Sequence, residues 1–244
     1  MSYPSVNLVV PAVALAVGAH PDDVEFGCGG TLAKWAAQGC RIHHLVCTDG
    51  SKGSWDPATD TAELVALRQA EQREASRRLG GAGEVTFLGW PDGELESGLR
   101  QRWEVAFAIR RARPDVVLGH DPWKRWRLHP DHRHAGFLLT DGVVAARDPH
   151  FFPEHSAPPH RPAHLLLWEA DEADHAEDVS GHARTKIAAL LAHRSQWRST
   201  MGIADPGDAA QREAFESKVV ERLATVGSRI GAEAGEEFKL VPAG

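Results

Sequence analysis

The feature that most constrains the fold is an alternation of short apolar runs with longer amphipathic segments along the chain. The apolar runs have the length and composition of buried strands and lie at residues 12–19, 41–47, 84–89, 115–119 and 164–170. Helical patterns lie between and after them, at residues 29–39, 61–79, 99–113, 131–147, 181–198 and 208–226. Strands that alternate with helices form βαβ units, which build a parallel sheet through right-handed crossovers. The sequence therefore predicts an α/β protein of the Rossmann-like type, with a mostly parallel sheet flanked by helices.

The chain contains no break that would divide this fold. Its 244 residues suit one larger α/β domain or two small ones, and neither a linker nor an internal repeat separates two halves. We expect a single domain over 1–244, with a core at 12–198 and a C-terminal helical extension from about 200 to 244. In the helix at 61–79, the positions expected to face the core are Leu64, Leu67, Ala70 and Ala75.

Polar side chains gather where the predicted strands end. His20, Asp22 and Asp23 follow the first strand, Asp49 follows the second, and Asp92 follows the third. A histidine-rich run at residues 119–134 follows the fourth strand. The carboxyl ends of parallel strands share one edge of the sheet, where open α/β folds bind their ligands. We therefore expect the functional site at this edge, with the first and last clusters facing each other.

Two of these clusters share a His-Pro-Asp frame, "HPDD" at 20–23 and "HPDH" at 129–132. A hydrolytic zinc site commonly has three histidine or carboxylate ligands and one position open to water. His20 and Asp23 from the first motif and His132 from the second supply such a set. The predicted cofactor is Zn²⁺, and Fe²⁺ suits the same ligands.

The remaining polar residues of the two motifs suit catalysis. Metal-assisted hydrolysis needs a base for the water and a donor for the developing oxyanion. Asp22 and His129 are the candidates for these two roles. The alternative is a pair of solvated turns, in which Asp131 caps the helix that it precedes.

The segments "AHPDDVEFGCGGTL" and "LHPDHRHAG" resemble the metal motifs of the LmbE-like (PIG-L type) zinc-dependent de-N-acetylases. Weaker similarity in "CTDGSKGS", "LRQAEQREA", "LGWPDGEL" and "KIAALLAHRSQW" extends the resemblance over most of residues 12–198. The resemblance implies zinc on His20, Asp23 and His132. It further implies that Asp22 is the general base and that His129 polarises the acetyl carbonyl while Asp131 orients His129.

The same resemblance implies the reaction and the assembly. It predicts hydrolytic removal of the acetyl group from an N-acetylglucosamine-containing or related small molecule, by attack of a zinc-bound water on the amide carbonyl. It also implies a homo-oligomer, either a trimer or a hexamer. Related activities within the family are an amidase of a thiol-sugar conjugate and a deacetylase of a glycosylated natural product, and both stay open as alternatives.

Substrate contacts follow from the resemblance as well. Arg68, Asp92 and Asp49 are the residues expected to bind the sugar. The alternatives are an ordinary ion pair of Arg68 with Glu63 or Glu71, and turn-stabilising roles for the two aspartates. Specificity is expected in the loops at 50–60, 120–128 and 148–163, in which Trp55, Trp123 and Trp126 either stack on a sugar or cover the core.

Composition bears on the remaining classes of function. A formal net charge of −7 argues against a nucleic-acid partner, and no apolar run reaches the length of a membrane span. The N-terminus lacks a basic signal-peptide region, so we expect a cytoplasmic protein. A non-catalytic sugar-binding module and a nucleotide-binding Rossmann protein are remote alternatives. The second would use "GCGG" at 27–30, which lacks the third glycine of the dinucleotide fingerprint.

Overall fold

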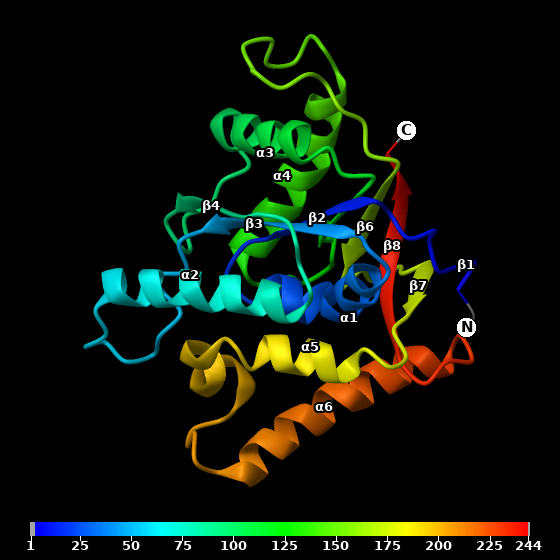
Figure 1. Ribbon diagram of the computed structural model, residues 1–244. Coiled ribbons are helices and arrows are strands. Elements are labelled where there is room, and N and C mark those ends of the chain that lie inside the picture. Colours follow the sequence, from blue (N-terminus) through cyan, green and yellow to red (C-terminus); the bar gives the residue numbers. More distant parts are fainter. Residues whose placement is uncertain (1–2, 244) are drawn as a thin grey trace.

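The computed structural model describes residues 3–243, in which one eight-stranded sheet is covered by helices on both faces (Figure 1). The strands are β1 (Ser5–Val6), β2 (Val13–Gly18), β3 (Arg41–Thr48), β4 (Val85–Trp90), β5 (Val116–His120), β6 (His164–Trp168), β7 (His175–Asp178) and β8 (Gly235–Pro242). The helices are α1 (Asp23–Ala37), α2 (Thr61–Arg78), α3 (Leu99–Ala112), α4 (Pro130–Arg147), α5 (Ala183–Leu190) and α6 (Ala209–Ser228). A 3₁₀ turn at Arg194–Gln196 and a π turn at Trp197–Met201 follow α5.

The sheet has the strand order β1-β7-β8-β6-β5-β2-β3-β4. The five strands from β6 to β4 are all parallel to their neighbours, and they correspond to the five predicted strands. Beyond β6 the direction changes, because β8 is antiparallel to both β6 and β7. This architecture confirms the predicted Rossmann-like α/β class with a mostly parallel sheet.

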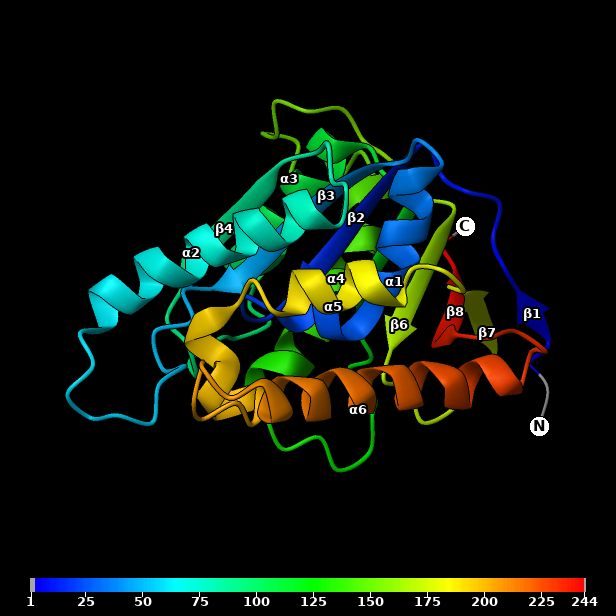
Figure 2. The same cartoon turned by 60° about the horizontal axis from the view of Figure 1, so that its bottom comes forward.

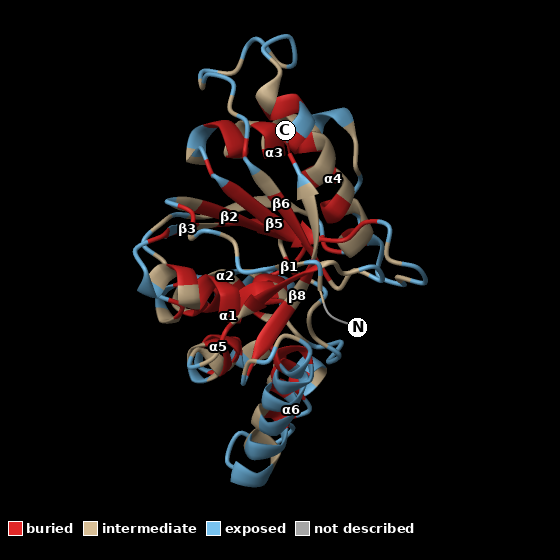
Figure 3. Ribbon diagram, turned by 90° about the vertical axis from the view of Figure 1, so that its right-hand side faces the viewer, coloured by how far each residue is buried: buried red, intermediate tan, exposed pale blue. Residues whose placement is uncertain are grey.

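Two apolar cores lie on the two faces of the sheet, and β2 contributes to both. Side chains alternate between the faces of a strand. Leu15 and Val17 accordingly pack in the core that α3 and α4 cover, whereas Ala14 and Ala16 pack in the core that α1 covers. The small alanines let α1 lie close to the sheet, with Trp35 fully buried beneath it. Buried residues therefore run through the centre of the molecule in Figure 3.

A third cluster joins α6 to α5 on the outer side of that second core. Phe215, Val219 and Leu223 of α6 pack on Ile187 and Leu190 of α5. Figure 2 shows α6 lying across this side of the molecule as an additional layer. No helix among residues 3–243 is long and apolar enough to cross a bilayer.

Three expectations about elements differ from the structure. The predicted helical extension contains α6, but residues 235–242 form β8 and lie inside the sheet. The first helix begins at Asp23, six positions before the predicted start at residue 29, and runs through the glycine-rich segment. The predicted helix at 181–198 ends at Leu190 as α5, and the 3₁₀ and π turns continue the chain.

The inward face of α2 is also different from the prediction. Leu64 and Ala75 are buried, but Leu67 is 49 % exposed and Ala70 is exposed. The buried positions between Leu64 and Ala75 are Arg68, Glu71 and Gln72. The apolar periodicity of α2 predicted only part of its buried face, because polar residues occupy the rest of that face.

Candidate active site

Both His-Pro-Asp motifs lie at one crevice because their strands are neighbours. The "HPDD" loop connects β2 to α1, and the "HPDH" motif stands where α4 begins after β5. β2 and β5 are hydrogen-bonded in parallel register, so their carboxyl ends meet at the same edge of the sheet. Proline at the first position of α4 suits this helix start, since that position needs no backbone donor.

A cavity of about 450 Å³ opens at this edge, and we call it the active-site cavity. The sequence-predicted residues that line it are His20, Asp22, Asp23, Arg68, Asp92, His129 and His132. Asp131 is fully buried and lies behind the wall of the cavity, and Asp49 does not line it.

His20, Asp23 and His132 form a group that suits a metal ion. Each offers one ligand atom, and these atoms all lie within 4.8 Å of one another. Two imidazoles and one carboxylate are a donor set found in hydrolytic zinc sites. Two further groups with this geometry share His20 or His132 with it, so the three form one connected polar cluster.

The surroundings of His20 favour the group that contains Asp23. Nε2 of His20 lies 3.1 Å from Asp131 Oδ2 and 3.2 Å from Asp92 Oδ1. Its Nδ1 faces Asp23 at 3.5 Å. A metal-binding histidine commonly gives its other ring N–H to a carboxylate, which fixes the tautomer. Asp131 and Asp92 supply that partner, and Nδ1 remains available on the side of Asp23.

Asp131 was expected to orient His129, and the hydrogen bonds that its carboxylate makes go to other residues. Its carboxylate accepts hydrogen bonds from the backbone N–H groups of Gly93 (2.6 Å) and Leu95 (3.2 Å), in addition to the His20 contact. No hydrogen bond joins Asp131 to His129 in the part of the chain that the structure describes, and Asp131 does not cap α4. Asp131 therefore holds the first motif against the loop after β4.

His129 is exposed and forms one wall of the cavity. Its ring lies 4.6 Å from that of His20 and 4.7 Å from that of His132, measured between centroids. Burial of part of the ring, together with the nearby imidazoles of His20 and His132, lowers the pKa of His129, and the Asp131 carboxylate opposes this effect only in part. The ring is accessible to a ligand in the cavity.

Asp22 is buried and held in an unusual conformation. Its φ of 99° lies in the left-handed region, which residues other than glycine rarely adopt. Burial raises the pKa of Asp22 to about 6, even though the Arg68 guanidinium, 3.9 Å away, opposes the shift. A carboxyl group with a pKa in this range can both accept and return a proton near neutral pH.

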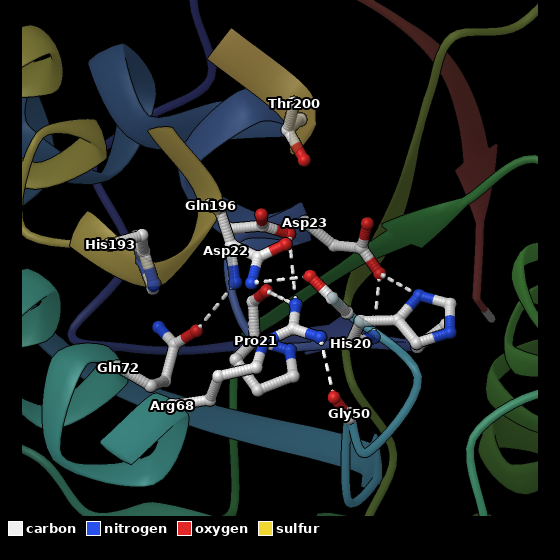
Figure 4. A network of polar contacts seen from close by, with 12 residues as sticks. His20, Pro21, Asp22, Asp23, Gly50, Arg68, Gln72, His193, Gln196 and Thr200 are labelled. Atoms are coloured by element: carbon white, nitrogen blue, oxygen red, sulfur yellow. Dashed lines mark hydrogen bonds and ion pairs between the residues drawn. The ribbon is translucent and has the colours of Figure 1, made fainter. Parts of the chain in front are cut away.

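A buried polar network beneath Asp22 was not predicted from the sequence. Gln72 Oε1 accepts the Asp22 backbone N–H at 2.9 Å, and Gln72 Nε2 donates to Glu25 at 2.8 Å. The same Glu25 carboxylate contacts His193 Nε2 at 3.2 Å (Figure 4 shows Gln72 and His193 to the left of Asp22). The sequence does place polar residues on the inward face of α2. A search for apolar periodicity passes over them, so the network was not predicted.

His120 at the end of β5 is a second residue that the sequence analysis did not identify. Its Nδ1 accepts the Trp168 indole N–H at 3.0 Å, so the proton of the neutral ring is on Nε2. That Nε2 lies 3.2 Å from Asp23 Oδ2, which also accepts the backbone N–H of His20. Asp23 Oδ1 is left facing His132 at 3.3 Å. His120 thus contacts the Asp23 oxygen that also faces His20 Nδ1, while the other oxygen faces His132.

The residues expected to bind substrate have different surroundings. Arg68 pairs with neither Glu63 nor Glu71; its guanidinium donates to the carbonyls of Gly50 (2.8 Å) and Pro21 (2.7 Å) and lines the cavity (Figure 4). Asp92 is buried at the cavity wall. Asp49 Oδ1 accepts the backbone N–H groups of Ser51 and Asp92, at 2.9 and 3.1 Å, which is a turn-stabilising role.

The three loop tryptophans do not cover the core. Trp55, Trp123 and Trp126 are 88 %, 64 % and 87 % exposed. The glycines of "GCGG" are packed against protein side chains, because a Cβ on Gly27 would lie 2.4 Å from the Trp168 ring.

Comparison with known proteins places the chain in a family. The family model described as "PIG-L: GlcNAc-PI de-N-acetylase" matches residues 15–143. A diacetylchitobiose deacetylase of Thermococcus kodakarensis is 34 % identical over 186 residues, which cover 75 % of this chain and 69 % of that protein. A 1D-myo-inositol 2-acetamido-2-deoxy-α-D-glucopyranoside deacetylase of Mycobacteroides abscessus is 32 % identical, over 75 % of this chain and 80 % of its own length.

A solved structure agrees with these relatives. The N,N′-diacetylchitobiose deacetylase of Pyrococcus horikoshii, bound to an inhibitor, superimposes with a TM-score of 0.84 and 28 % identity, covering 96 % of this chain and 85 % of that one. The fold and the edge site define an α/β protein of the LmbE-like deacetylase class. The chain belongs to the PIG-L family of de-N-acetylases.

Proposed function

We propose that this protein is a metal-dependent deacetylase that hydrolyses the acetamido group of an N-acetylglucosamine-containing small molecule. The observation that carries the proposal is the convergence of one cluster on one cavity. His20, Asp23 and His132 bring three ligand atoms together beside the buried Asp22 and the accessible His129. The named activities of the relatives support the choice of an acetylated amino sugar.

The residues of the active-site cavity have different roles in the proposed amide hydrolysis. His20, Asp23 and His132 would hold Zn²⁺ or Fe²⁺, which when bound acidifies water and polarises a carbonyl. Asp22 accepts a proton from the attacking water and later returns it to the departing amine, so that acetate and a free amino sugar leave. His129 donates a hydrogen bond to the carbonyl oxygen as negative charge develops on it.

Positioning and substrate binding fall to the neighbouring groups. Asp131 and Asp92 hold His20, and His120 holds Asp23, so the ligand atoms stay in place before a metal arrives. Arg68 and Asp92 border the cavity, and we propose that they bind sugar hydroxyls. For the assembly, we propose a trimer or hexamer, which light scattering of the purified protein tests.

The test is acetate release from a panel of N-acetylated sugars, free and conjugated. We expect activity with bound metal, loss of activity with a chelator, and recovery with zinc or ferrous iron. Asp22→Asn should keep the metal and lose about 10²–10⁴-fold in turnover, because the amide cannot accept the proton. Hydrolysis of other amides but of no acetamide would contradict the proposal and favour the amidase alternative.

A further inference from the structure

A second group of possible metal ligands overlaps the group that contains His20 and Asp23. It consists of His120, His132 and Glu169, whose ligand atoms also lie within 4.8 Å of one another. His132 belongs to both groups, and a neutral imidazole has one free lone pair, so His132 can serve only one of them at a time. Each group offers two imidazoles and one carboxylate. The donor chemistry therefore does not decide which group binds an ion.

The guanidinium of Arg127 occupies this second group. Its Nη1 lies 2.8 Å from Glu169 Oε2, 3.2 Å from His120 Nδ1 and 3.3 Å from His132 Nδ1. A guanidinium does not lose its proton in proteins, so the three acceptors already surround a permanent cation. The Arg127 side chain is enclosed, with only 5 % of its surface exposed. A metal ion and Nη1 cannot lie among these three atoms together.

The fold keeps Arg127 at this position despite an energetic cost. Its Nε and Nη2 are buried, and neither forms a hydrogen bond with any residue of 3–243, which costs roughly 1–3 kcal/mol for each donor. The neighbouring Trp126 and the partner Glu169 both have left-handed backbones, with φ of 62° and 59°. Lys124 of the same loop also donates to the Glu169 carbonyl, at 2.8 Å. The loop before α4 is thus fixed to the end of β6 so that Nη1 enters the second group.

We propose that Arg127 directs the metal ion to the group that contains His20, because it occupies the competing group as a fixed cation. An ion in the competing group would take His132 and leave His20 and Asp23 without their third ligand. Arg127 is therefore a positioning residue, which acts on the metal ligands and not on the substrate. The inference rests on the proposed function, since it takes the group with His20 as the catalytic one.

Zinc binding by variants that lack His20 tests the proposal, measured by competition with a chelating dye. His20→Ala leaves the first group with two ligands, so we expect this variant to lose its zinc. His20→Ala/Arg127→Ala opens the second group and should bind about one zinc ion per chain again. The affinity should be about 10–100-fold below that of wild type, because the ion must replace the Trp168 hydrogen bond on His120 Nδ1. Addition of Glu169→Gln removes the carboxylate ligand and should abolish the regained binding.

Control variants separate the position of the cation from a general change in charge. His20→Ala/Arg127→Lys keeps a cation at the contact, and His20→Ala/Arg125→Ala removes an exposed arginine of the same loop, so both should stay without zinc. His20→Ala/Arg127→Gln removes the charge with a smaller loss of volume and should also regain zinc, and circular dichroism verifies that each variant is folded.

Two results would overturn the proposal: no zinc in the folded variants that lack both His20 and the Arg127 charge, or regained binding that survives Glu169→Gln. Zinc content and acetate release of the wild type test the proposed function separately, since neither measurement uses these variants.

Discussion

Asp22 has a backbone conformation that a residue other than glycine adopts only at a cost, of about 1–3 kcal/mol. The structure shows what holds it there: its N–H is bound by Gln72, and Gln72 is itself fixed by the buried Glu25. The strained position directs a carboxylate into the active-site cavity beside Asp23. We therefore propose that the buried network acts on catalysis through the orientation of Asp22.

Replacement of Gln72 tests this link. Gln72→Met keeps the size of the side chain but removes the acceptor for the Asp22 N–H, so we expect kcat to fall by about 10-fold or more while KM and metal content stay near wild type. Kinetics and metal analysis on the same preparation measure these quantities. Ser76→Ala, on the same buried face of α2, is the control and should change stability only. Wild-type kcat in Gln72→Met would show that Asp22 needs no such support.

The contact of Asp131 with His20 allows a second test, in which Asp131 and His129 are replaced separately. Asp131 forms a hydrogen bond with His20, and we therefore propose that it supports His20 as a metal ligand. Loss of such a partner typically costs about 10–100-fold in metal affinity. We expect Asp131→Asn to weaken zinc binding by that factor in competition with a chelating dye. His129→Ala should keep zinc affinity and lose roughly 10²–10³-fold in turnover. Wild-type zinc affinity in Asp131→Asn would favour the pairing of Asp131 with His129.

At the scale of elements, the glycine-rich segment is a break in α1 that distant residues repair. Cys28 has non-helical angles, and the groups that this frees are satisfied from elsewhere. Lys186 of α5 donates to the Phe26 carbonyl at 2.8 Å, and Glu236 of β8 accepts the N–H groups of Gly30 and Thr31 at 2.9 and 2.7 Å. Lys186 and Glu236 are joined to each other at 2.6 Å.

This buried pair should behave as one unit. Lys186→Met and Glu236→Gln each leave one buried partner unmatched, which costs about 3–5 kcal/mol in free energy of unfolding. The double variant should lose clearly less than the sum of the two. Chemical denaturation of the wild type, the two single variants and the double variant gives the coupling energy between Lys186 and Glu236. Additive losses would mean that the two residues act independently on the break in α1.

Prediction from the sequence succeeded where an element is apolar and local. The five central strands were found because they are buried runs between turn signals, and α2, α3 and α4 were found because they alternate with those strands. The start of α1 was missed because Gly27, Gly29 and Gly30 oppose helix formation locally, whereas Trp168, Lys186 and Glu236 stabilise it from a distance. Local propensity does not include such contacts.

At the scale of the whole molecule, the sequence analysis did not predict the strands at one side of the sheet, β1, β7 and β8. β1 pairs with β7 across 170 residues (Ser5 with His175), and β7 pairs with β8 across about 60 residues (His175 with Phe238), so no local pattern records these contacts. β7 and β8 are also rich in charged residues, which obscures an apolar strand pattern. The candidate site was predictable to a larger extent, because its residues follow the central strands directly. His120 and Gln72 were missed because each acts through tertiary contacts.

Glu177 of β7 links its own strand to the segment after β1 and to α1. Its carboxylate is fully buried and binds the Leu8 N–H, His175 Nε2 and the Lys34 ammonium. Burial alone would raise the pKa of Glu177, but His175 and Lys34 outweigh it and hold the pKa below the ordinary value. An acid with a lowered pKa in the folded state stabilises the fold above its ordinary value near 4.5, and this contribution is lost as the pH falls through the folded-state pKa.

We therefore expect Glu177→Gln to be less stable than wild type at pH 7, by roughly 1–3 kcal/mol, because Lys34 and His175 lose their charged partner. As the pH falls below about 4.5, the free energy of unfolding of wild type should decrease more steeply than that of the variant, so the two curves converge. Urea denaturation at several pH values measures both effects. Glu172→Gln, at an exposed position before β7, is the control and should follow wild type throughout. Parallel curves for Glu177→Gln and wild type would contradict this account, because they would mean that the carboxylate titrates alike in the folded and unfolded chains.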